Sequence, residues 1–106
     1  MLLFYVTHPD EATAQRIADK LLQQKLIACA NIFPITSAYW WQNAIQKEGE
    51  WVSLLKTQPQ LADAVEQAVR AAHPYQTPCL LRMEVQANAD YEDWIRSSTE
   101  MAGGLR

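Results

Sequence analysis

The sequence predicts an α+β fold, a ferredoxin-like βαββαβ sandwich with a long central hairpin and an extra C-terminal helix. Short apolar runs typical of strands alternate with two segments whose apolar residues recur at helical spacing. The two middle strands follow each other across a tight turn, and no repeat, linker or low-complexity segment interrupts the order. The right-handed crossover rule then places the strands side by side in the order fourth, first, third, second.

Size and composition predict one domain over residues 1–106, with a frayed tail at residues 100–106. The net charge is −3 and no basic run is present, so nucleic-acid binding is not expected. No signal peptide pattern and no bilayer-spanning apolar run occur, so no membrane contact is expected. Cys29 and Cys79 are therefore interpreted as free thiols in a reducing compartment, which favours a cytoplasmic location.

The first strand and helix are predicted from one continuous and one periodic apolar pattern. Residues 2–7 form a short apolar run that is typical of a central strand. Residues 10–24 carry apolar side chains on one helical face. Thr7 or Asp10 can cap the first turn of this helix.

A long hairpin over residues 28–57 dominates the sequence. Its first arm is apolar on both strand faces, and Pro34 removes one donor, so this arm should bend or lie at a sheet edge there. The turn is predicted at residues 42–44, with Asn43 at positive φ. Each arm is much longer than the usual strand of roughly 5–6 residues, so part of the hairpin should project and expose its tryptophans. Such a patch predicts a partner, most simply copies of the same chain.

The second half of the chain predicts a helix, a strand and a last helix. Pro59 fits the first turn of a helix that ends at His73-Pro74, with a buried apolar stripe of Leu61, Val65, Ala68, Val69 and Ala72. Residues 79–86 alternate apolar and polar as in a half-buried strand. Asp90 can cap the final helix, which carries Tyr91, Trp94 and Ile95.

Several motifs together resemble the CutA family of divalent-cation tolerance proteins. The run ACANIFPITSAYWWQ is similar to the family signature ACVNI-P-x-SxYxW. Further matches are Leu55-Lys56-Thr57, His73-Pro74-Tyr75 and Tyr91-x-x-Trp94-Ile95, so the resemblance spans nearly the whole chain. Three departures are visible: the Gly-Lys of the hairpin tip is Asn43-Ala44, the usual Gly before the last helix is missing, and the glutamates of HPYE-x-PE are Gln76 and Cys79.

The resemblance implies a cytoplasmic homotrimer with a shape similar to that of PII-type signalling proteins. It also implies a link to tolerance of copper and other divalent ions, and no established reaction. We therefore expect a non-enzymatic protein that binds a divalent or soft metal ion, copper first, and contributes to the response to metal ions. A PII-like signalling module that binds a small ligand and docks on a protein partner is the alternative. A small hydrolase or isomerase using Lys56 and His73 is a third hypothesis, weakened because no nucleophile is paired with a base.

A metal site peculiar to this chain is predicted from topology. The first strand and the second helix end at the same edge of the domain, at His8 and His73, and the fourth strand begins there at Cys79. Two imidazoles and a thiolate suit Cu(I) or Zn(II), and Cys79 stands where the resembled family has a glutamate. The alternative is that these side chains share a surface without converging, with His73 acting as a helix-terminating histidine.

A ligand pocket is predicted from five other residues, four of which have a structural alternative. Cys29 is a soft ligand or a small buried hydrophobe, and Asn31 is a polar pocket group or a structural clamp. Lys56 binds an anion or lies along the surface. Trp41 stacks on a ligand or packs in the core or an interface, and Tyr75 follows His73 in the same turn.

Overall fold

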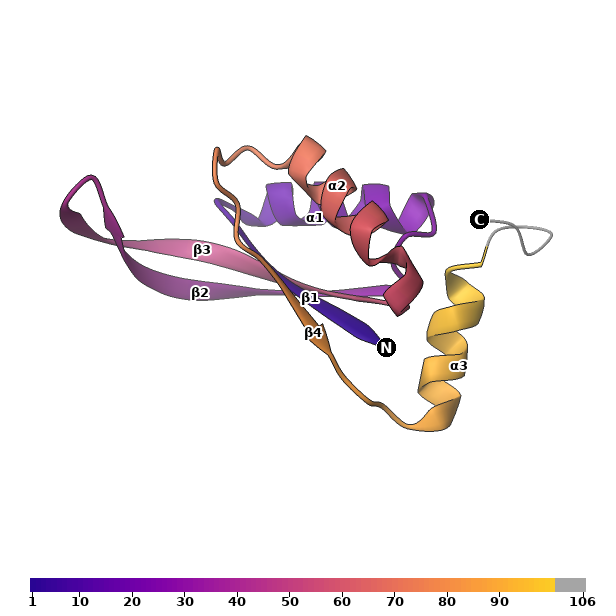
Figure 1. The fold of residues 1–106 in the computed structure, drawn as a ribbon. Coiled ribbons are helices and arrows are strands. Elements are labelled where there is room, and N and C mark those ends of the chain that lie inside the picture. Colours follow the sequence, from indigo (N-terminus) through magenta and orange to yellow (C-terminus); the bar gives the residue numbers. More distant parts are fainter. Residues whose placement is uncertain (101–106) are drawn as a thin grey trace.

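A computed structural model of the chain describes residues 1–100 (Figure 1). The elements are β1 (Leu2–His8), α1 (Glu11–Gln23), β2 (Cys29–Trp41), β3 (Ala44–Thr57), the short 3₁₀ helix η1 (Pro59–Leu61), α2 (Ala62–Ala72), β4 (Leu80–Glu84) and α3 (Ala89–Ser98). The sheet order β2-β3-β1-β4 is the predicted one, and all three pairings are antiparallel. The predicted ferredoxin-like order and extra helix are therefore confirmed. From residue 101 on, the predicted frayed tail lies outside the described residues.

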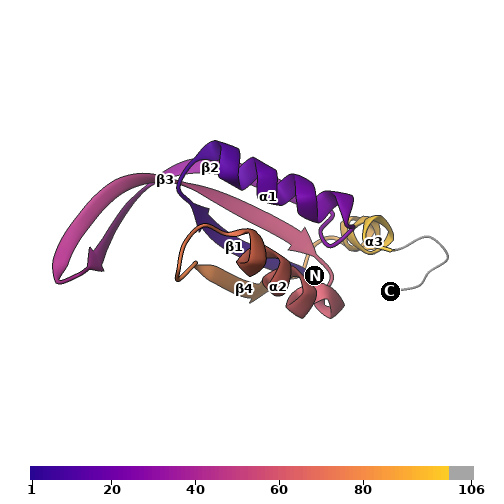
Figure 2. The same cartoon turned by 90° about the horizontal axis from the view of Figure 1, so that it is seen from above.

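The core lies between one face of the sheet and the helices α1 and α2, which cover that face side by side (Figure 2). β1 contributes Leu2, Phe4 and Val6, all buried. They pack in one cluster with Ile17, Leu21, Ile27, Leu55, Leu61, Val65 and Val69. Ala68 and Ala72 pack against this cluster, which confirms the predicted stripe of α2. None of the helices within residues 1–100 is long and apolar enough to cross a membrane.

The β2–β3 hairpin extends well beyond the helices (Figure 1). It turns through Gln42 and Asn43 with φ values of 52° and 64°, so both turn residues are left-handed. A two-residue turn with positive φ at both positions matches the twist of the flanking strands. Pro34 lies on β2, the edge strand, as predicted. At the tip, Trp40 keeps 71% of its surface exposed.

The second face of the sheet carries apolar side chains that α1 and α2 do not cover. Because side chains alternate along a strand, Leu3 and Tyr5 of β1 point away from the core. The strand registers place further residues on the same side, and we call the set of Leu3, Tyr5, Phe33, Leu54, Leu81 and Met83 the open face. In the single chain Leu81 is 52% exposed. The open face is therefore an apolar surface suited to a partner.

Two predictions about the C-terminal half are corrected. The strand predicted at residues 79–86 spans only Leu80–Glu84, and its buried contact is made by Leu80. The apolar side chains Leu81, Met83 and Val85 are exposed instead, because they lie on the side without α1 and α2. The last helix begins at Ala89, and its N-cap residue Asn88 makes no side-chain capping hydrogen bond. Asp90 lies inside the first turn, where its Oδ1 accepts a hydrogen bond of 3.1 Å from the N–H of Tyr91. The prediction that Asp90 is the N-cap residue is therefore wrong, although its carboxylate does bond one N–H of the first turn.

The cap of the first helix is as predicted. Asp10 is the N-cap of α1, and its Oδ1 accepts a hydrogen bond of 2.7 Å from the backbone N–H of Thr13. That hydrogen bond lowers the pKa of the Asp10 carboxyl. At the other end of α1, Lys25 is left-handed with φ of 56° and its N–H donates to the carbonyl of Leu22. This ending directs the chain into the edge strand β2.

Candidate functional site

A cleft of about 770 Å³ lies where the hairpin leaves the sheet. Tyr5 and Thr7 of β1 form its base. The hairpin supplies Ile35, Ser37, Ala38, Tyr39, Trp41, Glu48 and Glu50, and the segment after α2 supplies Pro74, Tyr75, Gln76, Thr77 and Cys79. The volume is in the range of small-molecule sites. Three residues predicted from the sequence, Trp41, Tyr75 and Cys79, therefore share one cleft.

Glu50 is the most buried acid of the cleft, with 8% of its surface exposed. Its Oε2 accepts a hydrogen bond of 2.6 Å from the hydroxyl of Tyr75. Burial, followed by this bond and the negative charge of Glu50, raises the pKa of Tyr75 far above its ordinary value. Tyr75 therefore stays a hydroxyl donor, and it ties the loop after α2 to the hairpin.

A second tyrosine–glutamate pair lies further out on the hairpin. The hydroxyl of Tyr39 donates to Glu48 Oε1, and the pKa of Tyr39 is raised by that hydrogen bond. Within residues 1–100, no Lys, Arg or His forms an ion pair with Glu48 or Glu50. None of the residues that line the cleft is Lys or Arg. The cleft is therefore acidic and aromatic.

His8 and His73 lie together, as the topology predicted. Their ring centroids are 5.2 Å apart with an interplanar angle of 25°. His8 is fully buried, and its Nε2 is 2.8 Å from Ser53 Oγ. Burial lowers the pKa of His8 from 6.5 to about 4, with a further contribution from the neighbouring His73.

His73 uses both ring nitrogens in backbone hydrogen bonds. Its Nε2 lies 2.7 Å from the carbonyl oxygen of Thr7, so this nitrogen carries the proton and donates. Its Nδ1 accepts a hydrogen bond of 3.1 Å from the backbone N–H of Tyr75. His73 therefore joins the end of β1 to the start of the cleft loop as a neutral ring. These two hydrogen bonds fit the alternative role of a helix-terminating structural histidine better than the predicted role of a metal ligand.

The predicted metal ligands do not form a ready-made site in this conformation. Within residues 1–100, no group of three His, Cys, Asp or Glu side chains is arranged to hold an ion. His8 Nδ1 is buried without a hydrogen-bond partner, so it is the one imidazole nitrogen of the pair left available. Burial, and secondarily the charge of Glu50, raises the pKa of the Cys79 thiol. A metal at these residues requires Cys79 to lose its proton and His73 to give up a hydrogen bond.

The other three predicted pocket residues lie away from the cleft. Cys29 pairs with Lys56 across β2 and β3, and Asn31 follows on the same side of β2. Cys29 Sγ is 3.9 Å from Asn31 Oδ1, while Lys56 Nζ is 3.3 Å from the hydroxyl of Tyr91 on α3. Asn31 is exposed in the single chain. The predicted pocket is thus divided between the two ends of the hairpin.

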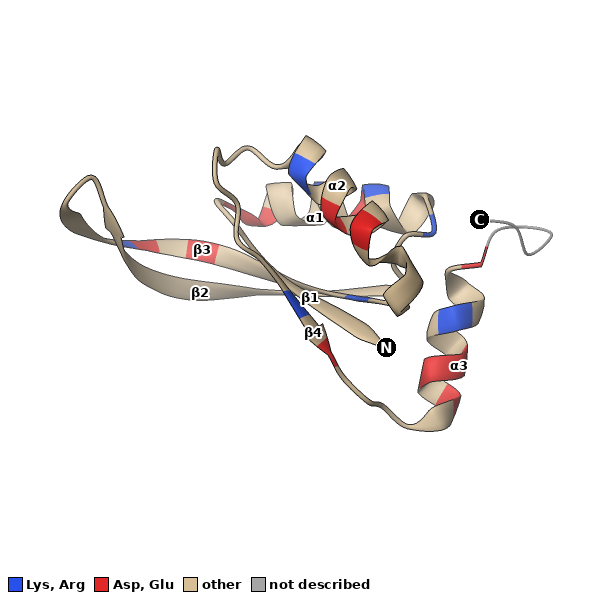
Figure 3. Cartoon of the chain, in the orientation of Figure 1, with Lys and Arg blue, Asp and Glu red and all other residues tan. Residues whose placement is uncertain are grey.

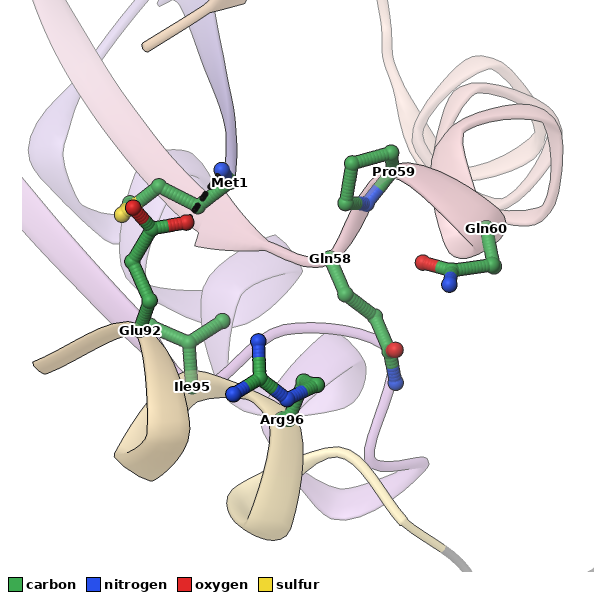
Figure 4. Close-up of a pocket in the computed structure, with 7 residues that line it drawn as sticks. All are labelled: Met1, Gln58, Pro59, Gln60, Glu92, Ile95 and Arg96. Carbon is green, nitrogen blue, oxygen red and sulfur yellow. Dashed lines mark hydrogen bonds and ion pairs between the residues drawn. The ribbon is translucent and has the colours of Figure 1, made fainter. Parts of the chain in front are cut away.

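A smaller cavity of about 240 Å³ lies between the N-terminal residue, η1 and α3 (Figure 4). The amino group of Met1 pairs there with Glu92 Oε1 at 2.8 Å. Glu92 Oε2 also accepts a hydrogen bond of 3.0 Å from the N–H of Ala87. The bond to the amino group, and after it the bond from Ala87, lowers the pKa of Glu92. These contacts fix α3 against the sheet end, so the cavity borders a structural joint.

Sequence reasoning missed Glu48, Glu50 and Ser53. Glu50 was grouped with the polar outer part of the hairpin, although strand alternation places it on the same side as the apolar Val52 and Leu54. Ser53 interrupts the core-facing side and lies opposite Val6. For Glu50 and Ser53, the available signal was a polar side chain at a position where strand alternation predicts an apolar one.

The comparisons with known proteins agree with the fold and with the sequence motifs. Residues 2–98 match the family described as the CutA1 divalent ion tolerance protein. The divalent-cation tolerance protein CutA of Thermotoga maritima is 38% identical over 99 residues, covering 92% of this chain and 98% of that protein. These names refer to tolerance of divalent ions.

Solved structures give the same answer. The periplasmic divalent cation tolerance protein CutA of Archaeoglobus fulgidus superposes with a TM-score of 0.91 at 37% identity, covering 94% of this chain and 100% of that one. The PII-like protein CutA of Nostoc sp. PCC 7120 superposes with a TM-score of 0.87 at 28% identity, covering 94% and 98%. With the family match over nearly its whole length, the chain belongs to the CutA1 divalent ion tolerance protein family.

Proposed function

We propose that this protein contributes to tolerance of divalent cations as a non-enzymatic cytoplasmic homotrimer that binds a metal ion, with copper as the first candidate. The observation that carries the oligomer is the open face, which is apolar and not covered by α1 or α2. Family membership supports the link to divalent ions. The proposal includes no nucleic-acid or membrane partner.

The edge of the sheet supports assembly as strongly as its open face. β2 is an edge strand of 13 residues that carries no charged side chain (Figure 3). Edge strands of monomers are usually protected by charge, by shortness or by a covering element. Phe33 on this strand and Leu81 on β4 are both exposed in the single chain. Copies of the chain that cover both features would remove the apolar surface from water.

Analytical ultracentrifugation of the purified protein tests the oligomer. At micromolar concentration we expect a single species of three times the 12.1 kDa chain mass. The physical reason is that closed symmetry covers the open face of every subunit equally. A monomer over the whole concentration range would contradict the proposal, and a stable dimer would replace it.

The metal part of the proposal rests on Cys79. Its thiolate is the softest ligand in the cleft, and thiolate and imidazole together suit Cu(I). His8 and His73 lie at the same end of the domain and supply the imidazoles of the proposed set. Ion binding would release the hydrogen bond between the N–H of Tyr75 and His73 Nδ1, so it would also loosen the cleft loop.

A Cu(I) competition titration against a coloured chelator tests this ligand set. We expect Cys79→Ser to weaken Cu(I) binding by about tenfold or more, because serine replaces the soft thiolate with a hard hydroxyl. Cys29→Ser is the matched control, because Cys29 is the second free thiol within the described residues and lies outside the cleft. Equal Cu(I) affinity of the wild type and both variants would remove Cys79 from the site.

A PII-like signalling module is the second candidate function. The Nostoc relative carries the description PII-like, and the loop after α2 is linked to the hairpin by Tyr75 and to β1 by His73. A small ligand in the cleft could therefore reposition that loop for a protein partner. Loop movement on ligand addition, followed by hydrogen exchange at residues 74–79, distinguishes this function from simple ion storage.

A further inference from the structure

We propose that assembly places Lys56 of one copy against the cleft of the next copy, where Glu48 and Glu50 lie. This contact rests on the proposed homotrimer and adds the interaction that orients its subunits. Three features of the molecule support it: the order of charges along β3, the lack of counter-ions within the described chain, and the lining of the cleft.

The charges on the open side of the sheet lie at its two ends. Strand alternation places Glu48, Glu50, Val52, Leu54 and Lys56 of β3 on the side that α1 and α2 do not cover. Two acids are thus followed by two apolar residues and then by a lysine. Within the described strands, the registers place no other charged residue on this side. The surface is therefore negative at the hairpin end, apolar in the middle and positive at the end near α3.

These three charges have no counter-ion in the part of the chain that the structure describes. Each one instead shares a hydrogen bond with a tyrosine hydroxyl, in the pairs Glu48–Tyr39, Glu50–Tyr75 and Lys56–Tyr91. A hydroxyl leaves the charge itself uncompensated, and a buried charge without a counter-ion is costly. Glu50 and Lys56 are separated along β3 by roughly 20 Å, so they cannot pair within one chain.

A second copy supplies the missing counter-ions in one relative orientation. Where like ends of two copies meet, acids face acids, and their repulsion opposes assembly. Where the hairpin end of one copy meets the α3 end of the next, every contact joins opposite charges. A ring of such head-to-tail contacts closes with each Lys56 and each acidic cleft used once. Charge complementarity therefore selects a second copy as the occupant of the cleft and fixes its direction.

The lining of the cleft suits a lysine side chain. Tyr39, Trp41 and Tyr75 lie around the acids. Aromatic faces attract an ammonium group, and they also cover the methylene groups of a lysine stem. Lys56 is half-buried in its own chain, and its Nζ lies 5.5 Å from the centroid of the Tyr91 ring. The cleft of the next copy adds carboxylates to the same kind of aromatic surface, so it can form charged hydrogen bonds with this ammonium group.

Zero-length cross-linking of the full-length wild-type protein tests the contact directly. A water-soluble carbodiimide joins a lysine amine to a carboxylate as an amide where the two groups touch. We expect mass spectrometry of the digest to find Lys56 joined to Glu48 or Glu50. Since the lysine is about 20 Å from Glu50 in one chain, an amide between these two residues joins two chains. Denaturing electrophoresis should accordingly show covalent dimers and trimers.

Matched charge variants test the orientation. Lys56→Glu should raise the dissociation constant of the assembly by at least about tenfold, because acids then meet at every contact. Adding Glu48→Lys to the same chain restores opposite charges, so the doubly substituted protein should recover at least part of the lost affinity. Lys47→Glu is the control, because Lys47 belongs to β3 but points to the other side of the strand. The control should change the dissociation constant by less than about twofold.

The head-to-tail contact and the proposed homotrimer fail separately. A wild-type trimer without the Lys56 amide, or equal dissociation constants for Lys56→Glu and Lys47→Glu, would overturn the contact and leave the trimer in place. Weakening by Lys56→Glu without recovery in the double variant would assign Lys56 a role within its own chain, and it would also overturn the contact. A wild-type dimer that carries the amide would keep the contact and replace the trimer. A wild-type monomer at every concentration would remove both.

Discussion

Replacing Leu81 with aspartate is expected to dissociate the proposed trimer into folded monomers. Leu81 is 52% exposed in the single chain, and it lies opposite Tyr5 on the open face. In the proposed trimer this position is buried between subunits. A carboxylate there would lose its hydration without gaining a partner, which costs several kcal/mol per subunit. Sedimentation at micromolar concentration should then give the 12.1 kDa species alone.

The control is Leu22→Asp. Leu22 is also a partly exposed leucine, at 39%, but it lies near the end of α1 rather than on the open face. Its substitution adds the same charge and removes the same side chain, so the trimer should persist. Far-UV circular dichroism of both variants should match the wild type, since neither leucine is part of the buried core. A trimeric Leu81→Asp protein would show that the open face is not the contact.

The element order could be predicted because strong local signals agree with one another. The alternation of strand and helix patterns gave the sheet order, and Asn43 marked the hairpin turn. Asp10 was identified as a cap because an acid directly before a periodic apolar segment satisfies the first free N–H groups. These features depend on interactions between residues close together in sequence, and the sequence pattern shows such local interactions directly.

The side of the sheet on which β4 buries its apolar residues could not be predicted. Alternation shows that Leu81 and Met83 share a face, and it does not show which face the helices cover. A monomeric protein would turn them inward, whereas here Leu80 packs against the core. Turning Leu80 toward the core and Leu81 and Met83 away from it is physically reasonable only when further subunits cover the open face. The error in the β4 prediction is thus itself an argument for assembly.

The candidate site could be predicted only in part, because its members come from distant segments. Topology correctly brought His8 and His73 together, yet it could not show that His73 bonds the Thr7 carbonyl and the Tyr75 N–H. Those bonds depend on the path of the loop after α2. The acids of the cleft were missed because charged residues near a hairpin tip are normally solvated. Their pairing with Tyr39 and Tyr75 is visible only in three dimensions.

The buried histidine His8 predicts a loss of stability in mild acid. Its ring is fully buried against Ser53 and His73, and burial lowers the pKa of His8 from 6.5 to about 4. Glu50 and Asp10 favour its protonated form, while His73 and Arg16 oppose it, and burial outweighs all four charges. In the unfolded chain the same imidazole has its ordinary pKa and binds a proton more readily. Between pH 6.5 and about 4 the unfolded state therefore holds one more proton than the folded state.

That extra proton stabilises the unfolded chain, so the free energy of unfolding should fall as the pH falls through this window. The full contribution of His8 is present above pH 6.5, and its loss by about pH 4 is on the order of 3 kcal/mol per subunit. Urea unfolding at fixed protein concentration, with a chelator present, measures this loss of free energy.

His8→Gln cannot titrate but can still hydrogen-bond Ser53, so the pH dependence of its unfolding free energy should be flatter. The carboxylates Asp10 and Glu92, whose pKa values are lowered in the folded chain, also lose stability in acid. Glu92 acts equally in both proteins, and Asp10 differs between them only through its interaction with the His8 charge, so the difference between the two curves reports His8 and that interaction. Parallel curves for the wild type and His8→Gln would show that His8 protonates as easily in the folded protein as in the unfolded chain.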